Sequence, residues 1–389
     1  MRIALLIRSL RTGGAERQLV TLARGLARLG HDVEVLSFYP GDAFEDELRG
    51  SGVGVNVLEK RGRWDLPGFV SRLARRLRAL RPDVLHGYLG VPNLLCAALR
   101  PLLPHTRIVW GVRASELQMH LYDDRWVGLE YRLEALLSSL PDLVIVNSHA
   151  GLEHAAKRGF PRSRMVVVPN GFDTARFRPD PEARARVRRE WAVADDEKLV
   201  GLVARLDPIK DHPTFLRAAA LLRARRKDVR FVCVGDGTSG YRTELERLAR
   251  QLGLDERALR WAGARADVPA VDNAFDVACC SSTSEGFPNV VAEAMACGRP
   301  CVVTDVGDAA RVVGELGLVV PRGAPEPFAH ALDRLLDQPP AAESIRRRVV
   351  DAFSERRLVA DTAAHLERLV DLNAADARAH SARRRIDRA

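Results

Sequence analysis

The sequence predicts an α/β protein built from two successive domains, each a doubly wound parallel sheet. Its 389 residues, 47% of them hydrophobic, are enough for two domains with a core each. Short β-branched or leucine-rich runs alternate with longer segments of helical period, which is typical of parallel strands joined by crossover helices. A turn-rich, arginine-rich stretch at 169–181 interrupts this alternation, which restarts at Lys198. We therefore expect an N-terminal domain over 1–175, a C-terminal domain over 190–353, a last helix over 354–372 and a polar tail over 373–389.

Seven short apolar runs in the first half are the expected strands of one sheet. Their composition suits strands that are buried on both faces. The runs are Ile3–Ile7, Val33–Ser37, Val53–Leu58, Val84–His86, Ile108–Trp110, Leu143–Val146 and Met165–Val168. Helical patterns between them fall at Ala15–Leu29, Gly68–Leu80 and Arg125–Ser139.

The second half repeats the pattern with six runs. They are Leu199–Val203, Arg230–Val234, Leu259–Trp261, Val277–Cys280, Cys301–Thr304 and Leu318–Val320. The helical segments are Asp211–Arg225, Thr243–Leu252, Val290–Cys297 and Pro325–Leu336. A last helical run, Ser354–Leu372, has no strand after it, so the pattern leaves open whether it closes the second domain or returns to the first. The tail after it is polar and is expected to fray.

The charge balance favours an anionic partner. Sixty Lys and Arg against 51 Asp and Glu give a net charge of +9, which suits nucleic acid, acidic lipid or a phosphorylated ligand. Aromatic residues are only 6% and no recognition motif occurs, so we expect no nucleic-acid partner. The six cysteines lie in apolar surroundings without a C-x-x-C pair and are expected to be buried, reduced thiols. Without a signal-like N-terminus or a spanning apolar run, the expected compartment is the cytoplasm.

Loops after predicted strands carry the candidate phosphate-binding residues, because ligands of such sheets lie outside the carboxyl ends of the strands. Gly13 and Gly14 precede a helix, where bare backbone N–H groups can approach an anion. Arg205 and Lys210 follow the first strand of the second half and can clamp a diphosphate. Gly235 and Gly237 follow the next strand in the run Val-Gly-Asp-Gly, where a ligand could lie against the backbone. Each of these motifs alone is also compatible with ordinary turns or solvated cations.

The strongest local signal runs from Ser284 to Pro300. Glu285 lies in a loop after a strand, and Gly286 lets that loop approach a ligand closely. The following helix begins near Asn289 and presents free N–H groups to ligand oxygens. Glu293, eight positions after Glu285, can accept hydrogen bonds from vicinal hydroxyls, as acidic residues do with ribose in other nucleotide folds.

Together these motifs resemble the retaining GT-B glycosyltransferases of family four, also called glycosyl transferases group 1. The ordered set is G-G-A-E-R, P-N-G-F-D, A-R-L-D-P-x-K, V-G-D-G, S-E-G-F-P-N-x-x-x-E-A-M-A-C-G-x-P and T-D-V-G-D, across about 370 of 389 positions. The resemblance implies two Rossmann-like domains facing a cleft, with the last helix crossing back onto the N-terminal domain. It implies transfer of a hexose from a UDP- or GDP-sugar to a glycan or lipid-linked acceptor, as in polysaccharide biosynthesis, with no metal and no cofactor.

The resemblance also assigns roles to residues. Arg205 and Lys210 would stabilise the negative charge that builds on the leaving diphosphate. Glu285, with the backbone of Gly286, would orient the hexose, and Glu293 would bind the ribose. The remaining donor-binding residues that it implies are Gly13, Gly14, Gly235, Gly237, Gly263, Phe287, Pro288, Asn289 and Val290. Competing functions are a GT-B sugar-nucleotide epimerase and a non-catalytic sugar-nucleotide-binding relative.

One position departs from the family pattern. Many members have a histidine after the fifth strand of the N-terminal domain, and Arg113 takes that place here. An arginine cannot act as a base or an acceptor, so it either contacts a phosphate or another acidic group, or is a neutral variant. His86 and His149 are alternative bases, each expected to be structural.

A basic stretch is a candidate membrane contact. Residues 60–81 contain eight Lys and Arg and one Asp, and apolar residues recur at helical spacing. Such a helix either packs its apolar stripe into its own domain or docks on anionic lipid at the inner face of the cell membrane.

Overall fold

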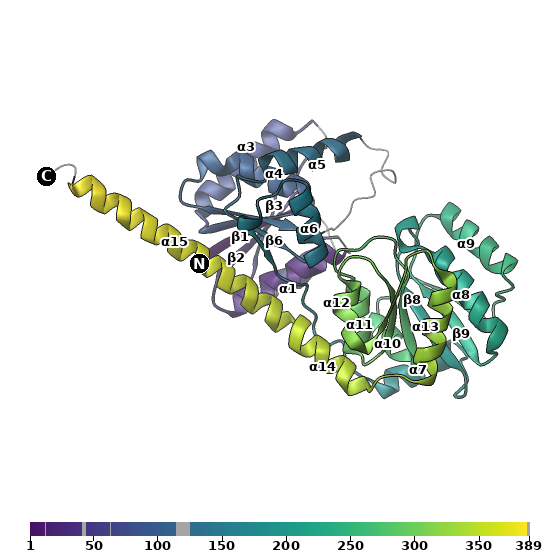
Figure 1. Ribbon diagram of the computed structural model, residues 1–389. Helices are drawn as coiled ribbons and strands as arrows, with labels where there is room; N and C mark the ends of the chain where they lie inside the picture. Colours follow the sequence, from purple (N-terminus) through teal and green to yellow (C-terminus); the bar gives the residue numbers. More distant parts are fainter. Residues whose placement is uncertain (12, 41–43, 63, 114–124, 387–389) are drawn as a thin grey trace. The chain divides into compact units, whose positions relative to one another are not determined.

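The computed structural model describes residues 1–11, 13–40, 44–62, 64–113 and 125–386, and within them the chain forms two compact units. Unit 1 consists of Met1–Gly171 and Glu355–Ala389, and unit 2 is Phe172–Ser354. Each unit contains one parallel sheet with helices on both faces (Figure 1). The prediction of two doubly wound α/β halves is confirmed. None of the described helices is both long enough and apolar enough to span a bilayer.

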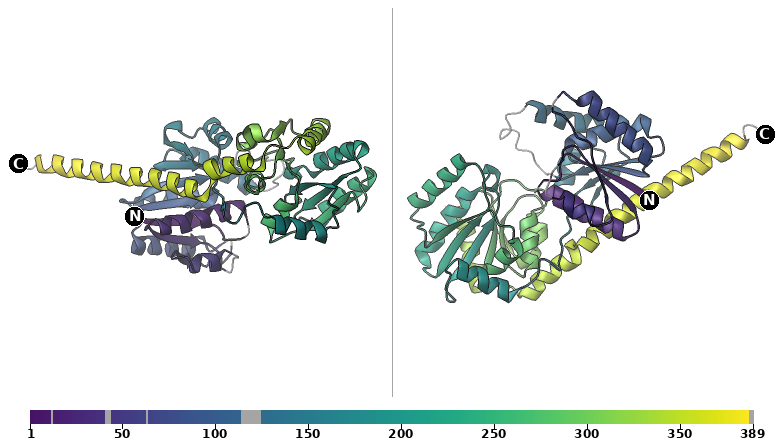
Figure 2. Two further views of the ribbon diagram at one scale, coloured as in Figure 1. Left: turned by 90° about the horizontal axis from the view of Figure 1, so that it is seen from below. Right: turned by 180° about the vertical axis from the view of Figure 1, so that it is seen from behind.

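The sheet of unit 1 has seven parallel strands in the order β3-β2-β1-β4-β5-β6-β7. The strands are β1 (Arg2–Ile7), β2 (Asp32–Ser37), β3 (Gly54–Val57), β4 (Val84–Tyr88), β5 (Arg107–Val112), β6 (Leu143–Val146) and β7 (Met165–Val167). The helices are α1 (Gly14–Arg28), α2 (Glu45–Arg49), α3 (Leu66–Leu80), α4 (Gly90–Leu99), α5 (Arg125–Leu137), α6 (His149–Lys157) and α15 (Glu355–Ile386). One face packs against α1 and α15, and the other against α3, α4 and α6 (Figures 1 and 2).

The sheet of unit 2 has six parallel strands in the order β10-β9-β8-β11-β12-β13. The strands are β8 (Lys198–Val203), β9 (Val229–Val234), β10 (Leu259–Gly263), β11 (Val277–Cys280), β12 (Cys301–Thr304) and β13 (Leu318–Val320). The helices are α7 (Pro181–Glu190), α8 (His212–Arg225), α9 (Ser239–Gln251), α10 (Val268–Ala274), α11 (Asn289–Ala296), α12 (Ala309–Val313), α13 (Pro325–Asp337) and α14 (Ala342–Phe353). Helices α8, α9 and α13 cover one face, and α7, α10, α11, α12 and α14 cover the other.

The last helix returns to the first unit, as the resemblance implied. Leu358 and Leu366 of α15 are buried in the core that α1 forms with the sheet of unit 1. Gly171 lies so close to this helix that a Cβ would meet Leu358. The helix starts at Glu355 and continues to Ile386, past the predicted end of the last helix at 372. The residues after 372 are rich in alanine and arginine, which favour helix.

The segment between the units is more ordered than predicted. Phe172, predicted to lie in the N-terminal domain, belongs to unit 2, where its ring stacks on Phe287 at 5.9 Å. The predicted interruption at 169–181 ends where α7 begins, and Val187 of this helix is buried in the core of unit 2. Asp180 caps this helix by accepting a hydrogen bond from Ala183 N at 2.9 Å. Because the segment contains many arginines, its sequence did not indicate the amphipathic helix that packs on the sheet of unit 2.

All six cysteines are free and buried, as predicted. Burial raises the pKa of the Cys280 thiol to about 11, with the charge of Glu285 adding to the rise, so this thiol stays protonated.

Candidate active site

The candidate site of unit 2 lies where its strand order reverses. Strands β8 and β11 are neighbours although three helices and two strands separate them along the chain, and Val200 pairs with Val277. Ligands of open α/β sheets bind outside the carboxyl ends of the strands at such a point. Lys210 follows β8 and Glu285 follows β11. Lys210 Nζ donates to Glu285 Oε1 at 2.6 Å, so the structure brings two predicted catalytic residues into direct contact.

Short hydrogen bonds fix the two loops to each other. Lys210 ends a 3₁₀ turn, and its carbonyl accepts from Ser281 Oγ at 2.8 Å. The backbone of Thr283 donates to Ile209 O at 2.8 Å. Ser282 Oγ donates to Glu285 Oε1 at 2.7 Å, on the same oxygen that receives the lysine. The ammonium and the carboxylate are therefore held before any ligand arrives.

The ion pair keeps Lys210 charged. Burial lowers the pKa of Lys210, but the charge of Glu285 and its hydrogen bond outweigh this effect, so the pKa lies above the ordinary value. A lysine ammonium has three N–H groups, and among the described residues Lys210 donates one of them to Glu285, so the others can serve ligand oxygens. His212, the first residue of α8, is buried, and burial together with Lys210 lowers its pKa to about 4. The histidine is therefore neutral at physiological pH.

Arg205 is placed differently from Lys210. Its side chain is 76% exposed and lies 3.4 Å from Asp207 Oδ2. The prediction treated both cations as a fixed clamp, but only Lys210 is held by a short contact. Asp207 is itself committed to the turn, since it accepts from Ile209 N at 3.1 Å.

The predicted glycines of unit 2 lie where two loops come too close to each other for a side chain to fit. A Cβ on Gly235, at φ +140°, would clash with the carbonyl of Ala204, and one on Gly237 would clash with that of Leu206. Gly263 has φ +66°, and its carbonyl accepts from Gly235 N at 2.8 Å. These glycines let the loop after β9 lie against the loop that carries Arg205, so they shape the site through the backbone.

The loop before α11 offers its backbone. The side chain of Phe287 is buried among Phe172 and Phe353, so this residue cannot present its ring to a ligand. The carbonyl of Gly286 accepts from Asp308 N at 3.0 Å. Helix α11 begins at Asn289, with Pro288 as its N-cap and no side-chain cap. The predicted residues Pro288, Asn289 and Val290 thus form the first turn of a helix at the carboxyl edge of β11.

Glu293 is half-buried on α11 and lies near a second acid. Asp272 of α10 is only 1% exposed. Burial, and then the charge of Glu293, raises the pKa of Asp272 well above its ordinary value. Sequence analysis did not single out Asp272, because an isolated aspartate in a helix carries no local signal.

In unit 1, the turn of Gly13 and Gly14 opens α1, with Gly13 as N-cap. The Glu16 carboxylate lies against Gly13, where a Cβ would clash with it. One turn further, Gln18 is buried; its amide donates to Gly171 O at 2.9 Å and accepts from Gly171 N at 2.8 Å. This pair ties the Pro-Asn-Gly motif to α1, which gives that motif a structural role.

Arg113 lies at the carboxyl edge of unit 1. Its Nη2 donates to Tyr88 Oη at 2.9 Å, and its Nη1 donates to Asn170 Oδ1 at 3.0 Å. The guanidinium also lies over the Tyr88 ring at 4.7 Å. His86 is fully buried. Burial, with a contribution from Arg113, lowers the pKa of His86 to about 3, so this imidazole is not a base at neutral pH. His149 starts α6 and is exposed.

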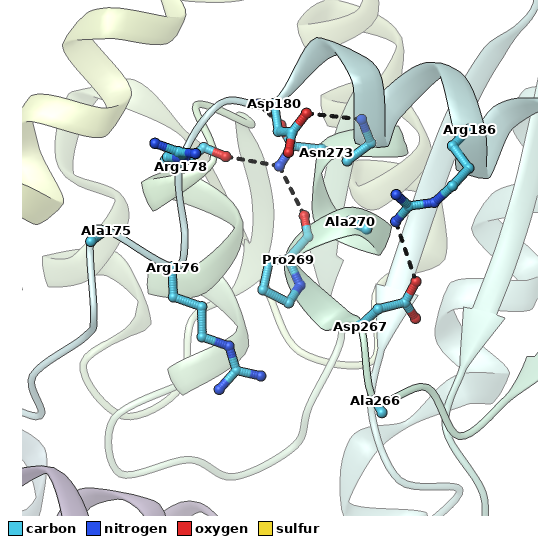
Figure 3. Close-up of a pocket in the computed structure, with 11 residues that line it drawn as sticks. Ala175, Arg176, Arg178, Asp180, Arg186, Ala266, Asp267, Pro269, Ala270 and Asn273 are labelled. Atoms are coloured by element: carbon cyan, nitrogen blue, oxygen red, sulfur yellow. Dashed lines mark hydrogen bonds and ion pairs between the residues drawn. The ribbon is translucent and has the colours of Figure 1, made fainter.

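A hollow of about 360 Å³ opens elsewhere on unit 2, between α7 and α10 (Figure 3). None of the predicted site residues lines it. Asn273 donates to Arg178 O at 2.9 Å and to Pro269 O at 2.8 Å, and Arg186 faces Asp267 at 3.9 Å. These contacts anchor the segment before α7 to α10.

The basic stretch packs its apolar stripe into its own domain. Phe69, Leu73 and Leu77 of α3 are buried in the core of unit 1. Two arginines are engaged in ion pairs: Arg72 with Asp65, and Arg76 with Glu34 at 2.6 Å. The exposed basic and large apolar residues of this stretch are Arg61, Trp64, Leu66, Arg75, Arg78 and Arg81, while Arg63 lies outside the described residues.

Comparisons with known proteins match both halves of the chain. The family described as "Glycosyltransferase Family 4" matches residues 12–176, and "Glycosyl transferases group 1" matches residues 197–338. D-inositol 3-phosphate glycosyltransferase 2 of Catenulispora acidiphila is 30% identical over 362 residues, covering 84% of this chain and 82% of its own. The chain belongs to glycosyltransferase family 4. A putative glycosyltransferase of Bacillus subtilis, EpsF, is 26% identical and covers 94% of this chain and 92% of its own.

Solved structures agree on the fold of this family 4 enzyme. Anabaena Alr3699/HepE in complex with UDP-glucose has a TM-score of 0.83 and 25% identity, covering 94% of this chain and 99% of that one. The predicted GT-B fold and transferase activity are thereby confirmed.

Residues that sequence analysis of this glycosyltransferase missed are mostly small and polar. Ser281 and Thr283 join the two loops of the site, and Ser282 donates to Glu285. Their signal was a Ser-Ser-Thr-Ser run directly after a buried strand. His212 and Gln18 carried no signal, since their roles depend on burial.

Proposed function

We propose that this enzyme transfers a hexosyl unit from a UDP- or GDP-sugar to a glycan or lipid-linked acceptor, with retention of the anomeric configuration. The observation that carries the proposal is the Lys210–Glu285 pair, 2.6 Å apart at the point where the strand order of unit 2 reverses. Support comes from relatives whose names state glycosyl transfer and from the similar structure that contains UDP-glucose.

In this proposal, Lys210 stabilises the leaving nucleoside diphosphate. Negative charge grows on the β-phosphate as the glycosidic bond breaks, and a cation already in place lowers the energy of that state without reorganisation. Glu285 keeps the ammonium charged and oriented, and its carboxylate can accept a hydrogen bond from a hydroxyl of the hexose. Arg205 is exposed, so its clamp role requires that its side chain turn toward the phosphates on binding. The first-turn N–H groups of α11 add donors for ligand oxygens.

Glu293 binds the ribose hydroxyls in this proposal, and the backbone of residues 286–289 contacts the hexose. Gly13 and Gly14 contact the diphosphate from unit 1. The glycines at 235, 237 and 263 contribute to donor binding indirectly, because they allow the backbone of the loops around the site to adopt its shape. No metal and no cofactor take part, since Lys210 and Arg205 supply the positive charge.

Donor binding is the first test. We expect one sugar nucleotide among UDP-glucose, UDP-galactose, UDP-N-acetylglucosamine, GDP-mannose and GDP-glucose to raise the melting temperature. At 100 times its dissociation constant it should add about 2.7 kcal/mol to stability. Glu293→Gln should weaken this binding, whereas Glu343→Gln, at an exposed position on α14, should not. If no UDP- or GDP-sugar shifts the melting temperature, the proposed donor class is wrong. If a donor binds and is epimerised without an acceptor, the enzyme is an epimerase instead.

We propose that unit 1 docks on anionic lipid through 60–81, which suits a lipid-linked acceptor. In sedimentation with vesicles, Arg75→Gln with Arg78→Gln should weaken binding by about 1 kcal/mol per arginine, roughly fivefold each. The matched control is Arg247→Gln with Arg250→Gln, which has the same spacing on α9 of unit 2. Binding should fall as salt rises and be weak on neutral vesicles. Equal binding to neutral and anionic vesicles would contradict an electrostatic dock.

A further inference from the structure

We infer that Arg113 is the centre of an anion-binding subsite in unit 1, which selects a substrate group bearing a carboxylate or a phosphate. The inference rests on the proposed function and adds a chemical class to one of its substrates.

The subsite lies at the carboxyl edge of the sheet, on strands next to its topological switch. The strand order of unit 1 reverses between β1 and β4, and β5 is the next strand after β4. In register, Tyr88 of β4 pairs with Gly111, and Val112 pairs with Val146 of β6. Arg113 and Asn147 are therefore adjacent, each one residue past a paired strand position. Asn170 lies three residues past the end of β7, at the same carboxyl edge of the sheet as Arg113 and Asn147.

The guanidinium is held in place by uncharged partners. Tyr88 Oη and Asn170 Oδ1 each accept one hydrogen bond, and the Tyr88 ring lies under the cation. No ion pair links Arg113 to a carboxylate in the part of the chain that the structure describes. Most other partly buried arginines of unit 1 do have one; Arg107, for example, lies 3.3 Å from Asp142. Arg113 is thus an oriented cation whose charge the described residues leave uncompensated.

Two polar atoms at this place have no hydrogen-bond partner among the residues that the structure describes. Asn147 is 3% exposed, and its Oδ1 is buried without a hydrogen bond in the described part of the chain. The buried Nε of Arg113 also has none. Buried polar atoms are rarely left unsatisfied, and such atoms commonly mark a ligand or an ordered water. An arginine can bind a carboxylate or phosphate through charge-assisted hydrogen bonds, while an amide oxygen can accept from a hydroxyl of the same molecule.

The two titratable side chains of β4 near Arg113, His86 and Tyr88, carry no charge at physiological pH. His86 is neutral at physiological pH because burial lowers its pKa to about 3. Burial raises the pKa of Tyr88 against the opposing effect of Arg113, so the phenol is also neutral. A positive charge among neutral groups attracts one negative group, which can belong to the donor diphosphate, to an acidic donor sugar or to the acceptor.

Calorimetric titration of the full chain distinguishes these sources. The probes are UDP, UDP-glucose and UDP-glucuronic acid, and then inorganic phosphate and glucuronate in the presence of saturating UDP. The variants are Arg113→Gln, Tyr88→Phe and the control Arg132→Gln, an exposed arginine of the same unit. We expect Arg113→Gln to weaken at least one probe tenfold or more, Tyr88→Phe to weaken the same probe less, and Arg132→Gln to change none.

The affected probe identifies the group. Equal loss for UDP and UDP-glucose assigns the donor diphosphate, and loss for UDP-glucuronic acid alone assigns an acidic donor sugar. Loss for phosphate or glucuronate on the UDP-bound enzyme assigns an acidic acceptor. If folded Arg113→Gln, checked by circular dichroism, binds every probe as the wild type does, the subsite does not exist. If the wild-type enzyme binds no UDP probe and GDP-sugars also fail in the melting assay, the proposed function fails first.

Discussion

Lys210→Ala is expected to lower kcat by about 10²–10³, which is the usual cost of removing one preorganised group that stabilises developing negative charge. The reason is that this ammonium is the cation held by a short contact at the carboxyl edge of unit 2, 2.6 Å from Glu285. Its loss also removes the positive charge beside the Glu285 carboxylate, which adds repulsion against the diphosphate. The measurement is release of nucleoside diphosphate under saturating donor and acceptor, with the donor taken from the melting assay.

Two controls sharpen this result. Lys227→Ala removes an exposed lysine of the same unit, whose ammonium donates to Arg223 O at 3.1 Å, and should leave kcat unchanged. EDTA should leave the wild-type rate unchanged, because the side chains supply the charge. A normal kcat for Lys210→Ala, or a wild-type enzyme that stops on chelation, would show that another group stabilises the leaving diphosphate.

Leu366→Ala should destabilise unit 1 by about 2–5 kcal/mol, the range for truncating a fully buried leucine. Leu366 is 0% exposed on α15 and packs in the core shared with α1 and the sheet. The comparison in the same helix is Leu372→Ala, at a leucine that is 62% exposed. This second change should shift stability by less than about 0.5 kcal/mol.

Denaturant unfolding, followed by tryptophan fluorescence and circular dichroism, measures both variants. Trp110 is buried in unit 1 and Trp191 in unit 2, so a transition of each unit has a reporter. We expect Leu366→Ala to move the transition of unit 1. Equal stability of the Leu366 and Leu372 variants would mean that α15 does not form part of the core of unit 1 in solution.

The sequence by itself determined the local elements of this enzyme. The runs that predict strands match observed strands to within a few residues, because a parallel strand buried on both faces must be apolar over most of its length. The glycine-rich turns also followed from local chemistry. Gly235 has φ +140° against the neighbouring loop, a conformation that only glycine adopts without strain.

Only the tertiary structure decided which of these loops meet. Lys210 and Glu285 are 75 residues apart, and they touch because β8 and β11 are adjacent in the sheet. Strand order depends on how all the crossover helices pack, so it cannot be predicted from any short stretch of the sequence. The same holds for α15, whose pattern fits either unit until Leu366 is seen in the core of unit 1. Arg113 shows the limit most clearly, because its residue type was visible at once, whereas its uncharged partners lie on two other strand ends that only folding brings beside it.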